Sequence, residues 1–248
     1  MTIETARDLQ GLLAVGRVVH GTIAAMEAAL RPGVTTAELD AVAQHYLARA
    51  GARSAPMIEV AYPGVTCISV NEEAAHGLPG PRQIAPGDLV TLDVAAELGG
   101  YYADAAVTVG VPPVKPAHQR LCICAKEALW AAVQAARRDH PLRAIGQAAE
   151  GVARHYGYRV VRALHGHGIG RRMHEAPRFV PHYDDAAARQ PLAEGLVIAI
   201  EPHLTLGSGD VIDAADGWTI RTRDRKRVAV FEHTIVVTAG EPIIVTAS

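Results

Sequence analysis

Two aspartates, Asp93 and Asp104, give the first indication of chemistry in this sequence. They lie in two strand-like runs joined by a Glu-Leu-Gly-Gly segment, which is typical of a hairpin turn. If the turn is centred between Leu98 and Gly99, the aspartates lie directly opposite one another, with Cβ atoms about 4.5–5.5 Å apart. Because their neighbours are apolar, two carboxylates at this distance need a proton or a cation between them. The pair favours a metal site; the alternatives are that both acids face solvent or that the register differs by one residue.

Three further side chains are candidate ligands for the same site. His167 stands in Gly-His-Gly-Ile-Gly, where glycines let the backbone approach an ion closely and present one imidazole rigidly. These glycines could also suggest phosphate binding, but they lack the spacing and the strand-to-helix setting of a phosphate loop. Glu201 ends an apolar run and precedes a proline, which ends a strand, and Glu232 lies inside a run of β-forming residues. Either glutamate could instead face solvent.

Together these residues offer four carboxylates and one imidazole, with no cysteine among them. An oxygen-rich set with one imidazole suits Mn, Fe(II), Co or Zn in a catalytic site more than a structural zinc. Four carboxylates carry too much negative charge for one divalent ion, so the set predicts two metal ions a few ångströms apart.

The composition limits the classes of partner. The chain has 248 residues, 49% of them hydrophobic, and a net charge of -2 without any basic or acidic block. This balance argues against nucleic acid or a membrane surface as the main partner. The first residues are charged and lack the apolar core of a signal peptide, and three cysteines form no zinc-finger pattern. We therefore expect a reducing, cytoplasmic setting.

The elements that must position the candidate ligands follow from hydrophobic periodicity. Helices are predicted over residues 3–30, 35–51 (from the capping box Thr35-x-x-Glu38), 116–136 and 142–156. Strands are predicted over residues 65–70, 89–94, 101–109, 159–163, 196–200, 218–222 and 228–237. The order helix–helix–strands thus occurs twice, which predicts an α+β fold with helices on one face of a mainly antiparallel sheet, in one domain over residues 1–248.

Several short motifs follow one another along nearly the whole chain. They are Cys-Ile-Ser-Val-Asn-Glu at 67–72, His-Gly-Leu-Pro at 76–79, Asp93 and Asp104, Gly-His-Gly-Ile-Gly at 166–170, His-Glu-Ala-Pro at 174–177, Ile-Glu-Pro at 200–202, Gly-Trp-Thr at 217–219 and Glu-His-Thr-Ile-Val-Val at 232–237. In these motifs the chain resembles the type I methionine aminopeptidases, which are pita-bread metallopeptidases. The resemblance implies a pseudo-two-fold pita-bread fold and removal of N-terminal methionine from nascent polypeptides, preferentially before a small second residue.

The resemblance also implies roles for the candidate ligands. Asp93, Asp104 and Glu232 would contact both or either metal, His167 would bind one, and Glu201 would bind the other and accept a proton from the bridging water.

Five further residues receive roles only through the resemblance. His76 and His174 would contact the substrate and the tetrahedral intermediate, although by sequence alone each could be an ordinary loop histidine. Tyr62, Cys67 and Trp218 would line the pocket for the methionine side chain, and an apolar pocket with aromatic and sulfur groups suits a thioether.

The chain also departs from the family pattern. Ala95 stands where a hydroxyl residue is common, Met173 replaces a frequent aromatic residue, and Pro56-Met57 occupies another pocket position. These changes concern the shape of the pocket. The lack of an N-terminal zinc-binding extension and of a long helical insertion suggests a short bacterial type I form.

Three alternatives stay open. An Xaa-Pro peptidase or creatinase relative would carry a separate N-terminal domain, whereas the first 60 residues here predict two helices only. A non-catalytic pita-bread binding protein would be expected to lack a ligand, and none of the five is missing. A structural α+β domain would require every motif to be coincidental. The expected partners are nascent polypeptide N-termini, including those at the ribosome, and we expect a monomer without nucleic-acid or membrane binding.

Overall fold

The computed structural model describes residues 1–247. The first half of the chain contains α1 (Ala6–Ala29), α2 (Thr36–Arg49), β1 (Arg53–Ser54), α3 (Ala55–Val60), β2 (Cys67–Val70), β3 (Glu73–Ala75), β4 (Leu89–Leu98) and β5 (Tyr101–Gly110). The second half contains α4 (Pro116–Ala135), α5 (Arg143–Tyr156), β6 (Arg159–Val160), β7 (Gly166–Gly168), β8 (Glu175–Val180), β9 (Val197–Ile200), β10 (Leu204–Thr205), β11 (Val211–Asp213), β12 (Ile220–Thr222), β13 (Val228–Ala229), β14 (His233–Val236) and β15 (Ile243–Ile244). The predicted order of two helices followed by strands, repeated once, is confirmed.

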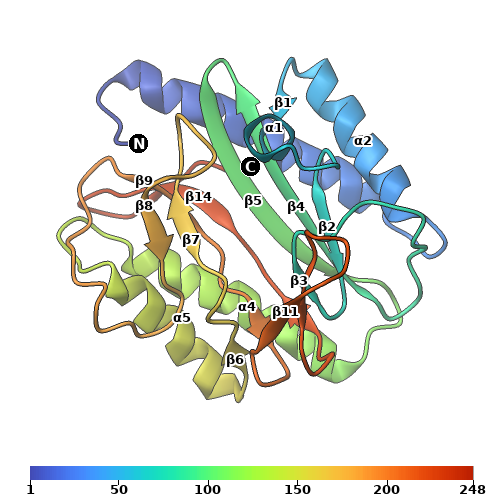
Figure 1. The fold of residues 1–248 in the computed structure, drawn as a ribbon. Helices are drawn as coiled ribbons and strands as arrows, with labels where there is room; N and C mark the ends of the chain where they lie inside the picture. Colours follow the sequence, from blue (N-terminus) through green and yellow to red (C-terminus); the bar gives the residue numbers. More distant parts are fainter. Residues whose placement is uncertain (248) are drawn as a thin grey trace.

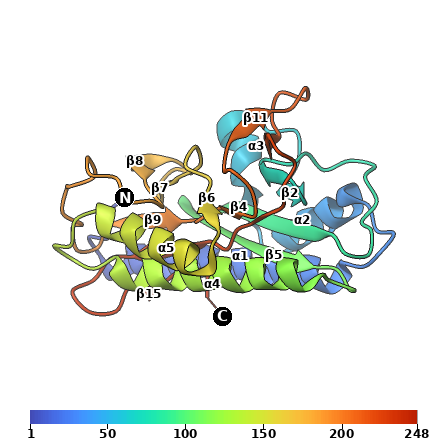
Figure 2. The ribbon, with the colours of Figure 1, turned by 90° about the horizontal axis from the view of Figure 1, so that it is seen from below.

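The strands form antiparallel sheets covered by helices. In the first half β1, β2 and β5 each pair with β4. In the second half a five-stranded sheet has the strand order β15-β14-β9-β7-β8. The long hairpin β4–β5 runs through the middle of the molecule (Figure 1). Figure 2 shows α1 and α4 along one side of the strands and the short helix α3 on the opposite side. The α+β architecture with the long helices on one face is as predicted.

Local signals account for the helix ends. Thr5 and Asp8 form a capping box at the start of α1, and Thr35 and Glu38 form another at the start of α2. By length and composition alone α1 could cross a membrane. It packs instead against β4, β5 and α2, as expected of an apolar helix that belongs to a core.

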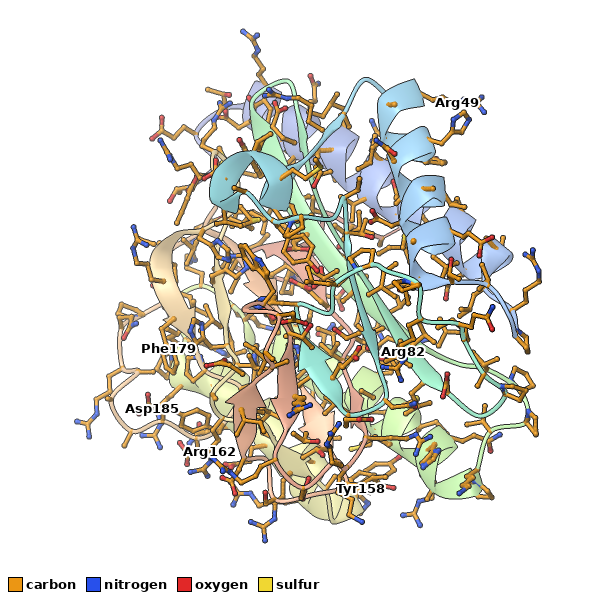
Figure 3. The ribbon with its side chains drawn as sticks, turned by 45° about the vertical axis from the view of Figure 1, so that its right-hand side comes forward. Arg49, Arg82, Tyr158, Arg162, Phe179 and Asp185 are labelled. Atoms are coloured by element: carbon orange, nitrogen blue, oxygen red, sulfur yellow. The ribbon has the colours of Figure 1, made fainter. Side chains whose placement is uncertain are left out.

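Buried apolar side chains form two clusters. The first lies around α1, α2 and the β4–β5 hairpin and also includes residues of the second half, among them Val197, Ala199 and Val236. The second lies around α4 and α5, against the other face of β9 and β14. Charged side chains are spread over the outside, and the labelled arginines Arg49, Arg82 and Arg162 lie on different parts of the surface (Figure 3).

The helix α3 was not predicted, so the expectation of only two helices in the first 60 residues was wrong. Ser54 caps it by accepting a hydrogen bond from the N–H of Met57 (3.4 Å), and Ala61 ends it in a left-handed conformation. Six residues are too few for a helical period to show in a sequence.

The register of the β4–β5 hairpin also differs from the prediction. Gly99 and Gly100 form the two-residue loop, with φ of 60° and 81°, so the turn is centred one residue later than expected. Asp104 therefore pairs with Ala95, and Asp93 pairs with Ala106. Since moving the centre by one residue moves every partner by two, the aspartates are diagonal neighbours on the same face instead of direct partners.

The predicted strand over residues 228–237 is broken in two. Its first part, β13, pairs with β10, and its second part, β14, pairs with β9 and β15 in another sheet. Between β13 and β14 the chain runs beside β5. There the N–H of Val230 donates to Thr108 Oγ1 (2.9 Å), and the N–H of Glu232 donates to the carbonyl of Ala106 (2.9 Å). Glu232 thus lies between two strands, directly beside β5.

Candidate active site

The carboxylates of Asp93 and Asp104 project from the same face of the central hairpin. Burial raises the pKa of Asp104 to about 6, and burial together with the charge of Asp104 raises the pKa of Asp93 well above its ordinary range. Thr234 fixes the backbone of Asp104 from the other half of the chain. Its Oγ1 accepts from the Asp104 N–H (2.9 Å) and donates to the Asp104 carbonyl (2.9 Å).

Glu232 reaches the site from the junction between β13 and β14. Its side chain is buried, and burial, followed by the charges of Asp104 and Glu201, raises the pKa of its carboxyl. One carboxylate oxygen of Glu232 and one of Asp104 are buried without a hydrogen-bond partner in residues 1–247. Such unpaired buried oxygens are costly unless a cation binds them.

His167 is the middle residue of β7, between two glycines that leave no space for a side chain. A Cβ atom on Gly166 would lie 2.2 Å from the carbonyl oxygen of Ala199, and one on Gly168 would lie 2.2 Å from that of Ala176. The Nδ1 of His167 lies 3.0 Å from the carbonyl of Gly168 and therefore carries the proton. Nε2 is then unprotonated, and its lone pair faces the acids in the form that binds a metal ion.

The imidazole of His167 is held neutral. Burial lowers its pKa to about 3, and its Nε2 lies 3.7 Å from Glu201 Oε1.

Glu201 follows directly after β9, as predicted, and two histidines hold its backbone. Its N–H donates to His182 Nε2 (3.1 Å), and its carbonyl accepts from His203 Nδ1 (2.8 Å). Burial and the charges of Asp104 and Asp93 raise the pKa of its carboxyl. These two supporting histidines were not predicted from the sequence. His203, two residues after Glu201, and the concentration of histidines in the second half were the available signals.

The donor set fits divalent metal ions. One atom each from Asp104, His167 and Glu232 lie within 4.8 Å of one another, and all three residues are buried. Within residues 1–247 no lysine or arginine pairs with any of the four acids, so their charges have no cation from the protein. Carboxylates with one neutral imidazole are ligands for catalytic metals.

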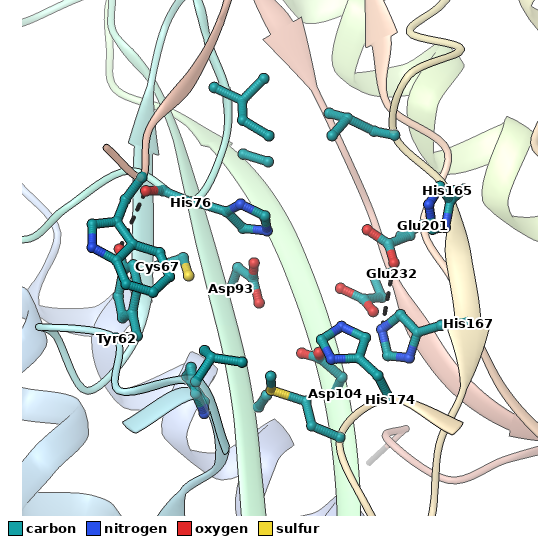
Figure 4. Close-up of a pocket in the computed structure, with 18 of the residues that line it drawn as sticks. Tyr62, Cys67, His76, Asp93, Asp104, His165, His167, His174, Glu201 and Glu232 are labelled. Atoms are coloured by element: carbon teal, nitrogen blue, oxygen red, sulfur yellow. Dashed lines mark hydrogen bonds and ion pairs between the residues drawn. The ribbon is translucent and has the colours of Figure 1, made fainter. Parts of the chain in front are cut away.

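The five candidate ligands line one cavity of about 400 Å³, and so do the other five predicted site residues. In Figure 4 Tyr62, Cys67 and His76 face Glu201, His167 and His174 across the cavity, with Asp93 between them. Besides the predicted residues, the cavity is lined by Pro56, Val60, Ala75, Ala95, Ala163, Leu164, His165, Met173 and Ile220.

One wall of the cavity is apolar and rigidly braced. The rings of Tyr62 and Trp218 meet edge to face with centroids 5.1 Å apart, and the Tyr62 hydroxyl donates to the carbonyl of Gly77 (2.8 Å). Cys67 pairs with Asp93 across β2 and β4, and burial raises the pKa of its thiol, which stays protonated and apolar. This wall offers an apolar surface directly beside the carboxylates.

Two further histidines face the cavity from loops. His76 has a φ of 55° and lines the cavity, and the ring of His174 lies 4.2 Å from that of His167, centroid to centroid. Burial lowers the pKa of both His76 and His174, so both rings are neutral at neutral pH and each can donate one N–H.

Comparison with known proteins agrees with this geometry. The model of metallopeptidase family M24 matches residues 10–239. Methionine aminopeptidase 2 of Bacillus subtilis (strain 168) is 40% identical over 247 residues, which is 99% of each chain. The crystal structure of a methionine aminopeptidase from Thermotoga maritima superposes with a TM-score of 0.96 at 31% identity, with 100% of both chains covered.

More distant similarity extends only to the fold. A prolidase from Pyrococcus furiosus has a TM-score of 0.79 at 21% identity, and this chain covers 66% of its length. The chain belongs to metallopeptidase family M24, and its full-length relatives group it with the methionine aminopeptidases of that family.

Proposed function

We propose that this chain is a methionyl aminopeptidase that uses two divalent metal ions to hydrolyse the peptide bond after an N-terminal methionine, preferentially when the second residue is small. The observation that carries the proposal is the position of four acidic side chains beside one neutral imidazole and an apolar cavity wall, where Asp104 and Glu232 each have a buried oxygen without a hydrogen-bond partner in residues 1–247. Full-length similarity to methionine aminopeptidases supports the choice of substrate.

The proposed ligands are Asp93, Asp104, His167, Glu201 and Glu232. Bound there, the ions would polarise the scissile carbonyl and lower the pKa of a water molecule. Their identity among Co, Mn, Fe(II) and Zn depends on supply, because the same donor set accepts each of them.

The protein's own groups would divide the remaining work. Glu201 would accept a proton, since its raised pKa makes the carboxylate a stronger base than an exposed glutamate. His76 and His174 would donate N–H groups to the substrate carbonyl as negative charge develops on it. Tyr62, Cys67 and Trp218 would hold the methionine side chain, which matches their apolar and sulfur-containing surface.

The proposed substrates are the N-termini of nascent polypeptides in the cytoplasm. The proposed form of the enzyme is a monomer of one domain. The test is hydrolysis of Met-Ala-Ser, Met-Leu-Ser and Ala-Pro-Ser by purified protein loaded with each metal in turn. We expect release of methionine, faster from Met-Ala-Ser than from Met-Leu-Ser. Cleavage of the proline peptide alone would instead identify an Xaa-Pro peptidase. Metal analysis of anaerobically purified protein would identify the bound ions and their number.

A further inference from the structure

The loop that carries His174 is held in place by contacts with other parts of the chain. This histidine loop, residues 169–174, joins β7 to β8 and also carries Met173, so two of its residues line the cavity. It contains no helix or strand. A side chain that must hold a reacting group in place needs its backbone fixed from outside.

Ile169 anchors the first residue of the loop, because it is buried, its N–H donates to the carbonyl of Val197 (3.2 Å) and its carbonyl accepts from the Met1 ammonium (2.9 Å). The backbone beyond Ile169 has two further fixed points. Glu175 Oε1 accepts hydrogen bonds from the N–H groups of Arg171 and Arg172, both at 2.6 Å. The carbonyl of Gly170 accepts from the N–H of Tyr102 at the start of β5 (2.9 Å). The second contact brings the loop against the tip of the β4–β5 hairpin.

The side chain of Arg171, which is 47% exposed, adds further contacts at this junction. Its Nη2 donates to Asp8 Oδ1 in α1 (2.7 Å) and to the Tyr101 hydroxyl (3.0 Å), and its Nη1 donates to the carbonyl of Gly100 (3.2 Å). Its guanidinium carbon also lies 3.8 Å from the centre of the Tyr101 ring. Because Tyr101 donates to the same oxygen of Asp8 (3.0 Å), the three side chains form one closed group. A planar group with several fixed donors can join three partners in this way.

Arg171 thereby connects two hairpin tips. One hairpin, β4–β5, carries Asp93 and Asp104, and the other, β7–β8, carries His167 and His174. We infer that Arg171 is a positioning residue, which fixes His174 relative to the carboxylates by tying the histidine loop to the tip of β4–β5. This inference rests on the proposed function, because it gives His174 a role in hydrolysis.

The next residue provides a matched control. Arg172 belongs to the same loop and carries the same charge, but its side chain is 73% exposed and approaches only Glu59, at 3.8 Å. Both arginines donate their N–H groups to Glu175, so a substitution at either position leaves the backbone contacts possible.

The first experiment compares Arg171→Gln, Arg171→Lys and Arg172→Gln on Met-Ala-Ser. We expect Arg171→Gln to lower kcat by about tenfold or more, with KM within about twofold, since only the placement of a reacting group changes. Bound metal should stay at the wild-type ratio. Arg171→Lys should recover part of kcat because an ammonium can still reach Asp8, and Arg172→Gln should stay within about twofold of wild type. Equal kcat in the two glutamine variants, or loss of metal from Arg171→Gln, would overturn the inference.

A double-mutant cycle tests whether Arg171 acts through His174. With enzyme in excess of peptide, which extends the measurable range, His174→Ala and the double variant with Arg171→Gln should hydrolyse the peptide at the same rate within about twofold. Multiplicative losses would show that Arg171 acts by another route.

Hydrogen exchange gives a result that does not depend on turnover. Amides of residues 169–174 should exchange faster in metal-loaded Arg171→Gln than in wild type and in Arg172→Gln. Equal exchange in all three proteins would overturn the inference even if the enzyme cleaves methionine peptides. Faster exchange in a protein that releases no methionine would support the anchoring and contradict the proposed function instead.

Discussion

At the scale of single residues, Asp104 shows most directly what the proposed metal site costs the folded protein. One of its oxygens is buried without a partner, and burial raises the pKa of its carboxyl to about 6. Three other acids with raised pKa values share the same cavity. Without a cation, their mutual repulsion and desolvation destabilise the folded protein.

We therefore expect Asp104→Asn to have opposite effects with and without metal. In the presence of a chelator at pH 7 the variant should be more stable than wild type by roughly 1–3 kcal/mol, because one buried charge has gone. In the presence of saturating metal it should be less stable, since a ligand is lost. Urea unfolding of both proteins under both conditions measures this. A variant that is less stable than wild type under both conditions would contradict the explanation.

The sign of this effect also fixes its pH dependence. The raised pKa means that the folded, metal-free protein binds its proton more tightly than the unfolded chain does. The destabilisation by Asp104 is therefore absent below about pH 4, grows as the pH rises through 6, and is complete above it. The stability difference between wild type and Asp104→Asn in chelator should follow the same course.

Glu201 tests the ligand set through activity. Glu201→Ala should bind less metal and lose nearly all turnover, by about a thousandfold or more, because a ligand and a proton acceptor are removed together. Glu194→Ala is a suitable control, since Glu194 is 54% exposed and pairs only with Arg138. The measurements are the metal content and the kcat on Met-Ala-Ser of both variants and of wild type. Normal turnover in Glu201→Ala would show that the ligand set is wrong.

Single residues were predicted from the sequence to different extents. Each acid stood out because an isolated charge among apolar neighbours is costly, and that contrast is visible without a structure. His182 and His203 could not be given their task, because they support Glu201 only after distant segments have folded together. His76 and His174 needed the family resemblance, since nothing in their own neighbourhood distinguishes them from surface histidines.

At the scale of elements, the start of α1 makes a testable contribution to stability. Hydrogen bonds from Thr5, and then from Tyr101 and the backbone of Thr5 and Glu4, outweigh desolvation and lower the pKa of Asp8 to about 2. A lowered pKa gives stability that is present above the unfolded value of about 3.9 and is lost as the pH falls through 2.

Asp8→Asn should accordingly be less stable than wild type at pH 7, and the difference should shrink between pH 4 and pH 2. Asp139→Asn, at a side chain that is 83% exposed, should differ little from wild type at any pH. Urea unfolding at pH 7, 4 and 3 measures both variants. A difference for Asp8→Asn that does not decrease toward pH 3 would show that the carboxylate charge is not responsible.

The tip of the β4–β5 hairpin provides a second prediction at this scale. Gly100 has a φ of 81°, so Gly100→Ala should destabilise the protein by about 1–2 kcal/mol. Gly151→Ala, in the interior of α5 with open space around it, should stabilise it by up to about 1 kcal/mol. Thermal unfolding of the two variants compares them. A neutral Gly100→Ala would mean that the loop can adopt another turn.

Elements were predicted best where many residues share one period. Helices α1, α2, α4 and α5 and strand β5 agree closely with the predicted ranges, whereas β4 begins as predicted but continues beyond residue 94 to Leu98. The segment 228–237 was wrong because its β-forming residues are continuous, while its partners belong to two different sheets. The predicted turn centre of the hairpin was wrong by one residue, which shifted each pairing by two, because the centre depends on which two residues take a positive φ.

At the scale of the whole molecule, the site is located where the two halves meet. Asp93 and Asp104 come from the first half, and His167, Glu201 and Glu232 come from the second. One apolar cluster contains side chains of both halves, Thr234 bonds to Asp104, and the backbone of Glu232 bonds to that of Ala106 across the junction. The site therefore exists only when both halves are folded and joined.

This arrangement predicts one cooperative unfolding transition for the whole chain. Far-UV circular dichroism and tryptophan fluorescence, from Trp130 in α4 and Trp218 near the cavity, should change together on heating. Saturating metal should raise the midpoint of both signals by the same amount, because its ligands come from both halves. Two separate transitions, with metal shifting only one of them, would show that the halves fold as independent domains.

The two glycines of β7 limit which substitutions this protein can accept there. Residues 166 and 168 face carbonyl oxygens of the neighbouring strands at distances that exclude even a methyl group. Any larger residue must widen the sheet between β8 and β9, and that movement would carry His167 away from Asp104 and Glu232. In a library randomised at both positions and selected for activity, glycine should therefore be recovered at each. The position of the His167 imidazole therefore depends on two flanking residues that have no side chain.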